Sequence, residues 1–89
     1  MSGAGPRVVI ADDDEDIREL VAFKLSNAGY EVRAARDGVE ALEAIMSFEP
    51  ALAILDVMMP GLSGLDVLRR LRDGEGPADC RALLLTARA

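Results

Sequence analysis

The sequence of 89 residues contains no histidine, no tryptophan and a single cysteine, Cys80. A lone cysteine excludes an internal disulfide and is typical of a reducing compartment. Structural and catalytic zinc sites are built mainly from histidine and cysteine, so a zinc centre is a poor candidate for this chain. The candidate ligands for a metal ion in this sequence are therefore oxygen atoms, mainly of aspartate and glutamate.

Positive charge and long apolar runs are also scarce. The chain has 10 basic and 16 acidic residues and a net charge of −6, which gives no support to direct nucleic-acid binding because that requires a basic surface. The apolar runs, such as Ala51–Leu55, are far too short to cross a membrane. The opening MSGAGPR lacks the apolar core of a signal peptide. We therefore expect a cytoplasmic protein.

Short apolar segments alternate with helical patterns along the chain, in which 51% of the residues are hydrophobic. Helical patterns of apolar residues follow Glu15, Asp37 and Ser63. The segments that read as strands are 7–11, 30–34, 51–55 and 81–85. This alternation predicts one α/β domain with a parallel sheet covered by helices on both faces.

The sequence also marks the helix ends. Gly29 is expected to end the first helix in a left-handed conformation, and Pro50 stops the second. Asp37 and Ser63 occupy positions that suit N-caps. The spacing of the third helix predicts an inward stripe made of Leu65, Leu68 and Leu71.

Five consecutive acidic residues, Asp12 to Asp16, follow the first strand. A helix N-terminus accommodates one or two acids, each worth about 0.3–1 kcal/mol. Two carboxylates about 4 Å apart, however, repel by roughly 4 kcal/mol at an effective dielectric near 20. The run therefore has two interpretations, a solvated acidic helix start or a cation site.

Polar side chains end three of the predicted strands. Asp12 and Asp13 follow the first strand, Asp56 the third and Thr86 the fourth. Because ligands of parallel sheets bind beyond the carboxyl ends of the strands, we expect these groups to converge. Three carboxylates suit Mg²⁺, and a carboxylate held near a cation can act as a nucleophile toward phosphorus. Thr86 would then donate its hydroxyl to a phosphoryl oxygen.

Four segments, in this order and spacing, resemble the receiver domain of two-component response regulators. They are VVIADDDEDIREL (8–20), GYEVRAARDGVEAL (29–42), ALAILDVMMPGLSGLDVLRRLR (51–72) and LLLTA (83–87). The resemblance implies that Asp56 is the phosphoacceptor and that Asp12 and Asp13 hold Mg²⁺, with the backbone carbonyl of Met58 as a further ligand. It also implies a histidine kinase or phosphotransfer protein as phosphoryl donor.

The resemblance extends to the end of the chain and to the fold. It implies that Thr86 is the switch hydroxyl and Ala87 the small residue beside the phosphoryl group. It further implies a flavodoxin-like doubly wound sheet with strand order 2-1-3-4, forming one receiver domain over residues 1–89. A complete receiver would add a fifth strand with a lysine and further helices. The chain stops at Ala89, and its one lysine, Lys24, lies on the first helix.

Other interpretations fit less well. An EF-hand loop starting at Asp12 would need glycine and glutamate where the chain has Ile17 and Phe23. The strand before Asp56 resembles a Walker B strand, but no phosphate-binding G-x-x-x-x-G-K-[ST] loop occurs. A haloacid-dehalogenase-type phosphatase would need a second aspartate at Met58. An enzyme acting on a separate small molecule is therefore not expected.

Two functional classes remain open. The first is a signalling module that accepts a phosphoryl group and catalyses at most its own phosphorylation and dephosphorylation. The second is a receiver-like binding module that acts without phosphorylation, which the missing lysine favours. We also expect self-association through the fourth strand, because apolar edge strands recruit other strands.

Overall fold

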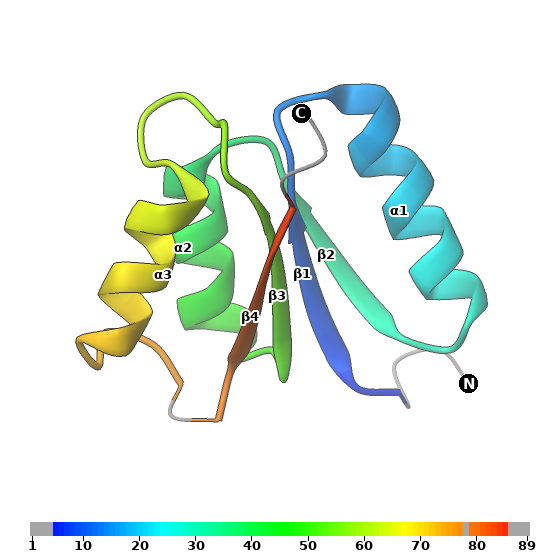
Figure 1. The fold of residues 1–89 in the computed structure, drawn as a ribbon. Coiled ribbons are helices and arrows are strands. Elements are labelled where there is room, and N and C mark those ends of the chain that lie inside the picture. Colours follow the sequence, from blue (N-terminus) through cyan, green and yellow to red (C-terminus); the bar gives the residue numbers. More distant parts are fainter. Residues whose placement is uncertain (1–4, 78, 86–89) are drawn as a thin grey trace.

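The computed structural model describes residues 5–77 and 79–85, which form four strands and three helices in alternation (Figure 1). The elements are β1 (Arg7–Ala11), α1 (Glu15–Asn27), β2 (Glu31–Ala35), α2 (Gly38–Phe48), β3 (Leu52–Asp56), α3 (Gly64–Arg72) and β4 (Arg81–Leu85). In this described part of the chain no helix is both long and apolar enough to span a membrane.

The strands form one parallel sheet in the order β2-β1-β3-β4, which confirms the predicted order. Each connection runs through a helix, so the carboxyl ends of the strands all lie at one edge, the upper edge in Figure 1. Among the described strands, β4 pairs with β3 alone and β2 with β1 alone. The strand-end side chains are thereby brought to a common edge.

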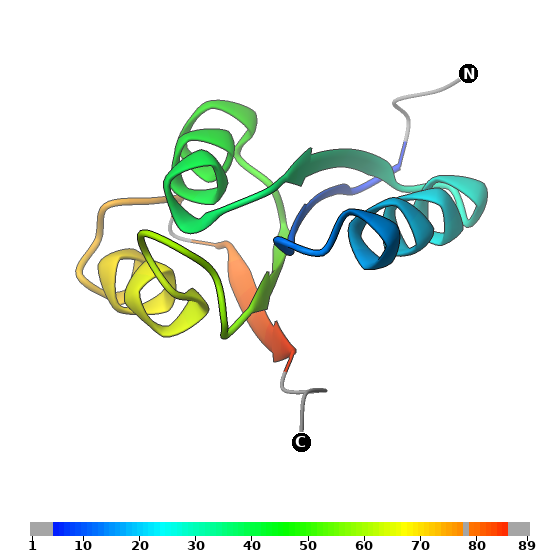
Figure 2. The ribbon, with the colours of Figure 1, turned by 90° about the horizontal axis from the view of Figure 1, so that it is seen from above.

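The helices cover both faces of the sheet. Figure 2 shows α1 on one face and α2 with α3 on the other. The side chains of β1 alternate between these faces, as the pleat of a strand requires. Val8 and Ile10 pack in the cluster beneath α1, and Val9 and Ala11 in the cluster beneath α2 and α3. The core is thus divided in two by the sheet.

The two halves of the core differ in size. The cluster beneath α2 and α3 contains eleven buried apolar residues, and the one beneath α1 contains three. Each of the 13 residues of α1 is at least partly exposed. Leu20 and Phe23 keep 54% and 63% of their surface exposed. The helix α1, which begins within the acidic run, is therefore the least deeply packed of the three.

The packing of α3 differs from the prediction. Val67 is fully buried, whereas Leu65 remains 47% exposed, so the prediction that Leu65 faces inward is wrong. The buried face of α3 is defined by Gly64 and Val67, with Leu71 packed against the same core. Because an α-helix turns about 100° per residue, Leu65 lies a quarter turn from Gly64 and points away from the sheet.

Each helix begins at a side chain that accepts backbone hydrogen bonds. The Asp14 carboxylate accepts bonds of 3.0 and 3.2 Å from two amides of α1, and that of Asp37 accepts one of 2.8 Å from Glu40. At α3, the Ser63 hydroxyl accepts the Asp66 N–H at 3.2 Å while the Asp66 carboxylate accepts the Ser63 N–H at 3.0 Å. The predicted caps at Asp37 and Ser63 are confirmed.

The last residue of α2, Phe48, anchors that helix at the amino edge of the sheet. The guanidinium carbons of Arg33 and Arg7 lie 4.4 and 5.3 Å from the centre of its ring. Arg7 also donates a 2.8 Å hydrogen bond to the Phe48 carbonyl, which is one of the free carbonyls at a helix C-terminus. Because the C-terminus of α2 is fixed at the amino edge of the sheet, its N-terminus lies toward the carboxyl edge.

The reciprocal bonds at the start of α3 give a prediction for stability. Replacing Ser63 with alanine should lower the free energy of unfolding by about 1 kcal/mol at pH 7. Hydrogen bonds from the Ser63 amide and hydroxyl hold the pKa of Asp66 below its ordinary value. A lowered folded pKa contributes stability above the unfolded pKa that is lost as the pH falls through the folded value. The difference between Ser63→Ala and wild type should therefore shrink below about pH 4.

Urea unfolding at pH 7 and pH 3 measures both quantities. Ser26→Ala, at an exposed position near the end of α1, is the control and should change the free energy of unfolding by less than about 0.5 kcal/mol. A Ser63→Ala effect of the same size at both pH values would contradict the role of Asp66.

Candidate acidic site at the carboxyl edge of the sheet

Parallel pairing of β1 and β3 brings two aspartates together. Ala11 lies opposite Leu55 in the register, so the next residues, Asp12 just after β1 and Asp56 at the end of β3, lie side by side. Asp12, Asp13 and Asp56 each offer a carboxylate oxygen, and these oxygens all lie within 4.8 Å of one another. Asp12 and Asp56 are only 2% and 3% exposed, whereas Asp13 is exposed. The expected convergence of the three carboxylates is observed.

Asp12 is held at its amide, side chain and carbonyl. Its N–H donates to the Ala35 carbonyl of β2 at 3.1 Å. Its carboxylate accepts the Asp14 N–H at 2.9 Å, and its carbonyl accepts a 2.9 Å bond from the guanidinium of Arg18. The loop between β1 and α1 is therefore tied both to the sheet and to the helix that it precedes.

Asp56 is positioned by the end of β3 and by the loop that follows. Its Oδ1 accepts the Met58 N–H at 3.2 Å. The next residue, Val57, is tied to β4 and α3, since its N–H donates to the Leu85 carbonyl at 3.3 Å and its carbonyl accepts the Gly64 N–H at 3.2 Å. The side chain of Met58 is 65% exposed. The Asp56 carboxylate is thus buried, whereas the chain reaches the surface two residues later at Met58.

Two glycines allow the loop 57–63 to lie close to the rest of the site. A Cβ on Gly64 would be 2.5 Å from the carbonyl oxygen of Asp56, and a Cβ on Gly38 would overlap the backbone of Leu62. Gly38 is the first residue of α2. The loop that follows the candidate phosphoacceptor therefore rests directly on the N-terminus of α2.

The remaining predicted site residues are not placed by the structure. Thr86 and Ala87 lie outside the described residues. Leu85, the last described residue of β4, pairs with Asp56, so β4 ends at the same edge as the acidic residues. Lys24 lies in the last turn of α1, at the opposite end of that helix from the acidic loop.

The donor set fits a hard divalent cation. Three carboxylates whose oxygens approach within 4.8 Å repel one another, and at about 4 Å each pair costs roughly 4 kcal/mol at an effective dielectric of 20. A cation such as Mg²⁺ prefers oxygen ligands and keeps several waters, which suits a cluster with one exposed member. The arrangement can hold such an ion beside a buried carboxylate.

Sequence reasoning missed two contributors to this geometry, Arg18 and Gly38. Arg18 bonds to a main-chain carbonyl six residues earlier, and Gly38 makes room for a backbone 24 residues later. Both contacts are made to backbone carbonyl groups, which a sequence pattern does not reveal. The sequence predicts a helix start at Asp37, but it does not reveal that Gly38 is approached closely by another loop.

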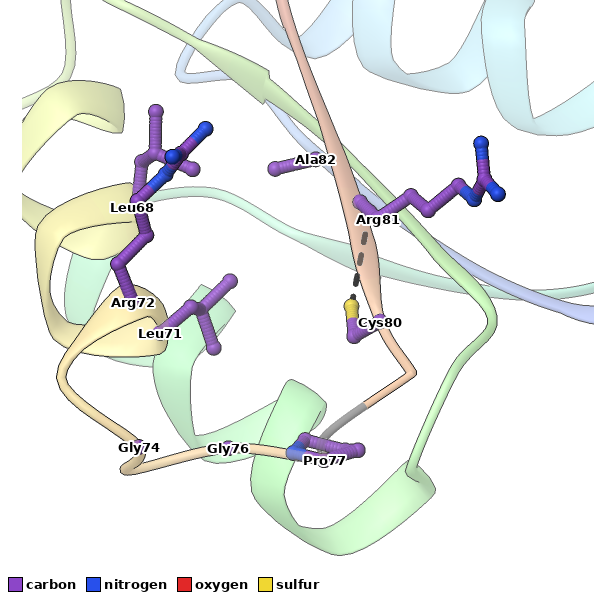
Figure 3. Close-up of a pocket in the computed structure, with 9 residues that line it drawn as sticks. All are labelled: Leu68, Leu71, Arg72, Gly74, Gly76, Pro77, Cys80, Arg81 and Ala82. Carbon is purple, nitrogen blue, oxygen red and sulfur yellow. Dashed lines mark hydrogen bonds between the residues drawn. The ribbon is translucent and has the colours of Figure 1, made fainter.

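A pocket of about 580 Å³ lies away from the acidic site, between α3 and the amino end of β4 (Figure 3). Its lining includes Leu68, Leu71 and Ala82, and no carboxylate is among its lining residues in the described part of the chain. Cys80 borders it and donates a 3.6 Å sulfur hydrogen bond to the Arg81 carbonyl. Burial raises the pKa of the Cys80 thiol, which keeps it protonated and poorly reactive at neutral pH.

The family model described as the response regulator receiver domain matches residues 8–89 of the chain. Among curated proteins, the response regulator MprA of Mycobacterium tuberculosis is 51% identical over 82 residues, which cover 92% of this chain and 35% of that protein. The chain thus spans about a third of the length of this relative.

Two solved structures agree with the fold. The response regulator TrrA of Thermotoga maritima, in complex with Mg²⁺–BeF, is 40% identical with a TM-score of 0.80, over 94% of this chain and 71% of that one. A chemotaxis protein of Vibrio cholerae is 34% identical with a TM-score of 0.87, over 97% of this chain and 72% of that one. Both similarities extend over the elements that carry the acidic site.

The contact between Gly38 and Leu62 gives a second prediction. Because the added methyl of Gly38→Ala would overlap a backbone, the loop or the helix must move, and overpacking of this kind costs about 1–3 kcal/mol. Urea unfolding should show this loss, and amide NMR signals of residues 57–63 should shift. Glu43→Ala, at an exposed position of α2, should leave both unchanged. A Gly38→Ala protein as stable as wild type would contradict the close packing of the loop.

Proposed function

Since the chain belongs to the response regulator receiver domain family, we propose that it accepts a phosphoryl group on Asp56 in a Mg²⁺-dependent reaction. The observation that supports this most directly is the cluster of Asp12, Asp13 and Asp56, with oxygens within 4.8 Å and Asp56 only 3% exposed. The donor we propose is the phosphohistidine of a histidine kinase or a phosphotransfer protein.

Asp56 is the nucleophile in this proposal. One carboxylate oxygen of Asp56 forms a bond to phosphorus as the phosphorus–nitrogen bond of the donor breaks, and the imidazole nitrogen that leaves takes up a proton. The 3.2 Å hydrogen bond from the Met58 N–H to Oδ1 restrains the rotation of the carboxylate. A carboxylate restrained in this way presents its other oxygen in a defined direction, which favours an in-line displacement.

We propose that Asp12, Asp13 and Asp56 hold Mg²⁺, with the backbone carbonyl of Met58 as a further ligand. When bound, Mg²⁺ supplies positive charge that offsets the charge developing on the phosphoryl oxygens. Asp12 is buried and fixed at three atoms, so it provides a rigid ligand. Asp13 is exposed and faces the solvent from which the ion and the phosphodonor arrive.

Further roles follow from family membership. We propose that Thr86 is the hydroxyl that senses the phosphoryl group and that Ala87 provides space beside it, within one receiver domain over residues 1–89. The protein would act in the cytoplasm as a signalling component. Its chemistry would be limited to its own phosphorylation and dephosphorylation.

A phosphorylation-independent binding module is the second candidate. The observation in its favour is that the one lysine of the sequence, Lys24, lies in the last turn of α1. Phosphoryl transfer depends on positioned positive charge, and Lys24 places its charge at the opposite end of α1 from the acidic residues. The acidic cluster itself has no use in that alternative, which is why we favour phosphorylation.

Phosphorylation is tested with a small phosphodonor. Acetyl phosphate and Mg²⁺ should form an acid-stable, base-labile acyl phosphate on wild type, detected by intact-protein mass spectrometry. Asp56→Asn should abolish the modification because an amide is not a nucleophile toward phosphorus. Removal of Mg²⁺ with a chelator should reduce it at least about tenfold.

Asp73→Asn is the matched control, because it makes the same change at an exposed residue just after α3, and it should be modified like wild type. Equal modification of Asp56→Asn would remove Asp56 from the proposal. Binding of a kinase by wild type without any acyl phosphate would favour the contact-only alternative.

We also propose that this chain self-associates through β4. Within the described sheet, the outer edge of β4 pairs with no other strand, and Leu83 at its centre is 53% exposed. Unpaired backbone groups beside apolar side chains recruit a further strand. Exposed Leu20 and Phe23 on α1 add apolar surface. A second copy of the chain, paired edge to edge, would cover the exposed edge of β4.

Sedimentation velocity of the 89-residue chain at micromolar concentration should show species larger than a monomer. Leu83→Lys should shift the distribution toward monomer, because a charged residue on an edge strand opposes pairing. Leu65→Lys, which makes the same change at an exposed leucine of α3, should have no such effect. A single monomer boundary for wild type would be incompatible with self-association.

A further inference from the structure

Arg18 reaches back from α1 to the loop that carries two of the acidic residues. Its backbone N–H donates to the Asp14 carbonyl at 2.9 Å, as part of the first turn of the helix. Its side chain is partly buried, and the guanidinium donates a 2.9 Å bond to the Asp12 carbonyl. One residue therefore links the start of α1 to the last peptide before Asp13.

That bond constrains Asp13 in particular. The carbonyl of Asp12 and the amide of Asp13 belong to one planar peptide unit, so fixing the carbonyl direction also fixes the plane from which the Asp13 side chain departs. Asp12 has two further bonds, from its amide and to its carboxylate. Asp13 is the exposed member of the cluster, and its amide belongs to the peptide unit whose carbonyl accepts the Arg18 bond.

We propose that Arg18 is a positioning residue that holds the Asp12–Asp13 peptide so that the Asp13 carboxylate stays directed at the cation site. This inference rests on the proposed function, because it assigns Arg18 a role in the Mg²⁺ affinity of that site. The role is exerted through the backbone, and Arg18 does not contact the cation.

The charge of Arg18 acts in the opposite direction from its hydrogen bond. A guanidinium close to a cation site repels the cation, so removing it would strengthen cation binding if charge were its main contribution. If positioning is the main contribution, removing Arg18 weakens binding despite the loss of a repelling charge. The sign of the change in affinity therefore separates the two effects.

Mn²⁺ binding by electron paramagnetic resonance tests this in wild type, Arg18→Met and Lys24→Met. Lys24→Met is the matched control because it removes the same charge from the last turn of α1. We expect the Kd for Mn²⁺ to rise about tenfold in Arg18→Met, as is typical when a group that orients a metal ligand is lost. In Lys24→Met the Kd should stay the same or fall slightly.

A second measurement uses the protein without metal. The ¹⁵N order parameter of the Asp13 amide should fall in Arg18→Met and remain at its wild-type value in Lys24→Met, because only the first variant removes the guanidinium bond to the Asp12 carbonyl. If Arg18→Met does not fold, judged by urea unfolding, Arg18→Lys replaces it. The lysine keeps the charge, but its nitrogen is one bond short of the guanidinium position.

An unchanged or lower Kd in the Arg18 variant, with an unchanged Asp13 order parameter, would overturn the proposal. Failure of the proposed function has a different signature. If wild type itself binds no Mn²⁺, the metal site fails, and the Asp13 order parameter alone then decides whether Arg18 positions that residue.

Discussion

Parallel pairing of β1 with β3 is the constraint on which the acidic site depends. Three carboxylates that repel one another would separate in a flexible chain, yet Asp12 directly follows the buried strand β1 and Asp56 ends the buried strand β3. The strands are fixed by apolar side chains such as Ile10 and Leu55, both fully buried. Burial of apolar surface is the dominant favourable term in folding, and here it keeps charges together that electrostatics alone would drive apart.

Much of the fold could be predicted because local and global patterns agree. The alternation of elements, the strand positions to within one residue and the helix starts follow from apolar spacing and from capping residues such as Asp37 and Ser63. The strand order was predicted from the resemblance to receiver domains and is the order observed. The error at Leu65 has a local cause. A helix of nine residues is too short for spacing alone to define its buried face. One of the two buried positions is Gly64, which has no side chain and packs against the Asp56 carbonyl of β3.

The site was predictable only to the extent that side chains define it. The carboxylates of Asp12, Asp13 and Asp56 could be expected at one edge because strand ends of a parallel sheet share an edge. Contacts to main-chain atoms could not be predicted in this way, because every residue has a carbonyl. The sequence therefore does not show which carbonyl accepts the Arg18 bond. Thr86 and Ala87 remain predictions, because the structure describes β4 only to Leu85.

The unequal halves of the core have a consequence for motion at the acidic site. Segments with few buried apolar contacts open locally at a lower free energy than the rest of a domain, and α1 rests on three buried residues where α2 and α3 share eleven. Asp13 precedes α1, whereas Asp56 belongs to β3, which contributes to both clusters. The acidic cluster thus joins a segment with a small core to a segment with a large core, and we expect the first to open locally at a lower free energy than the second. An ion bound by residues of both segments would oppose the local opening of α1, because that opening would separate its ligands.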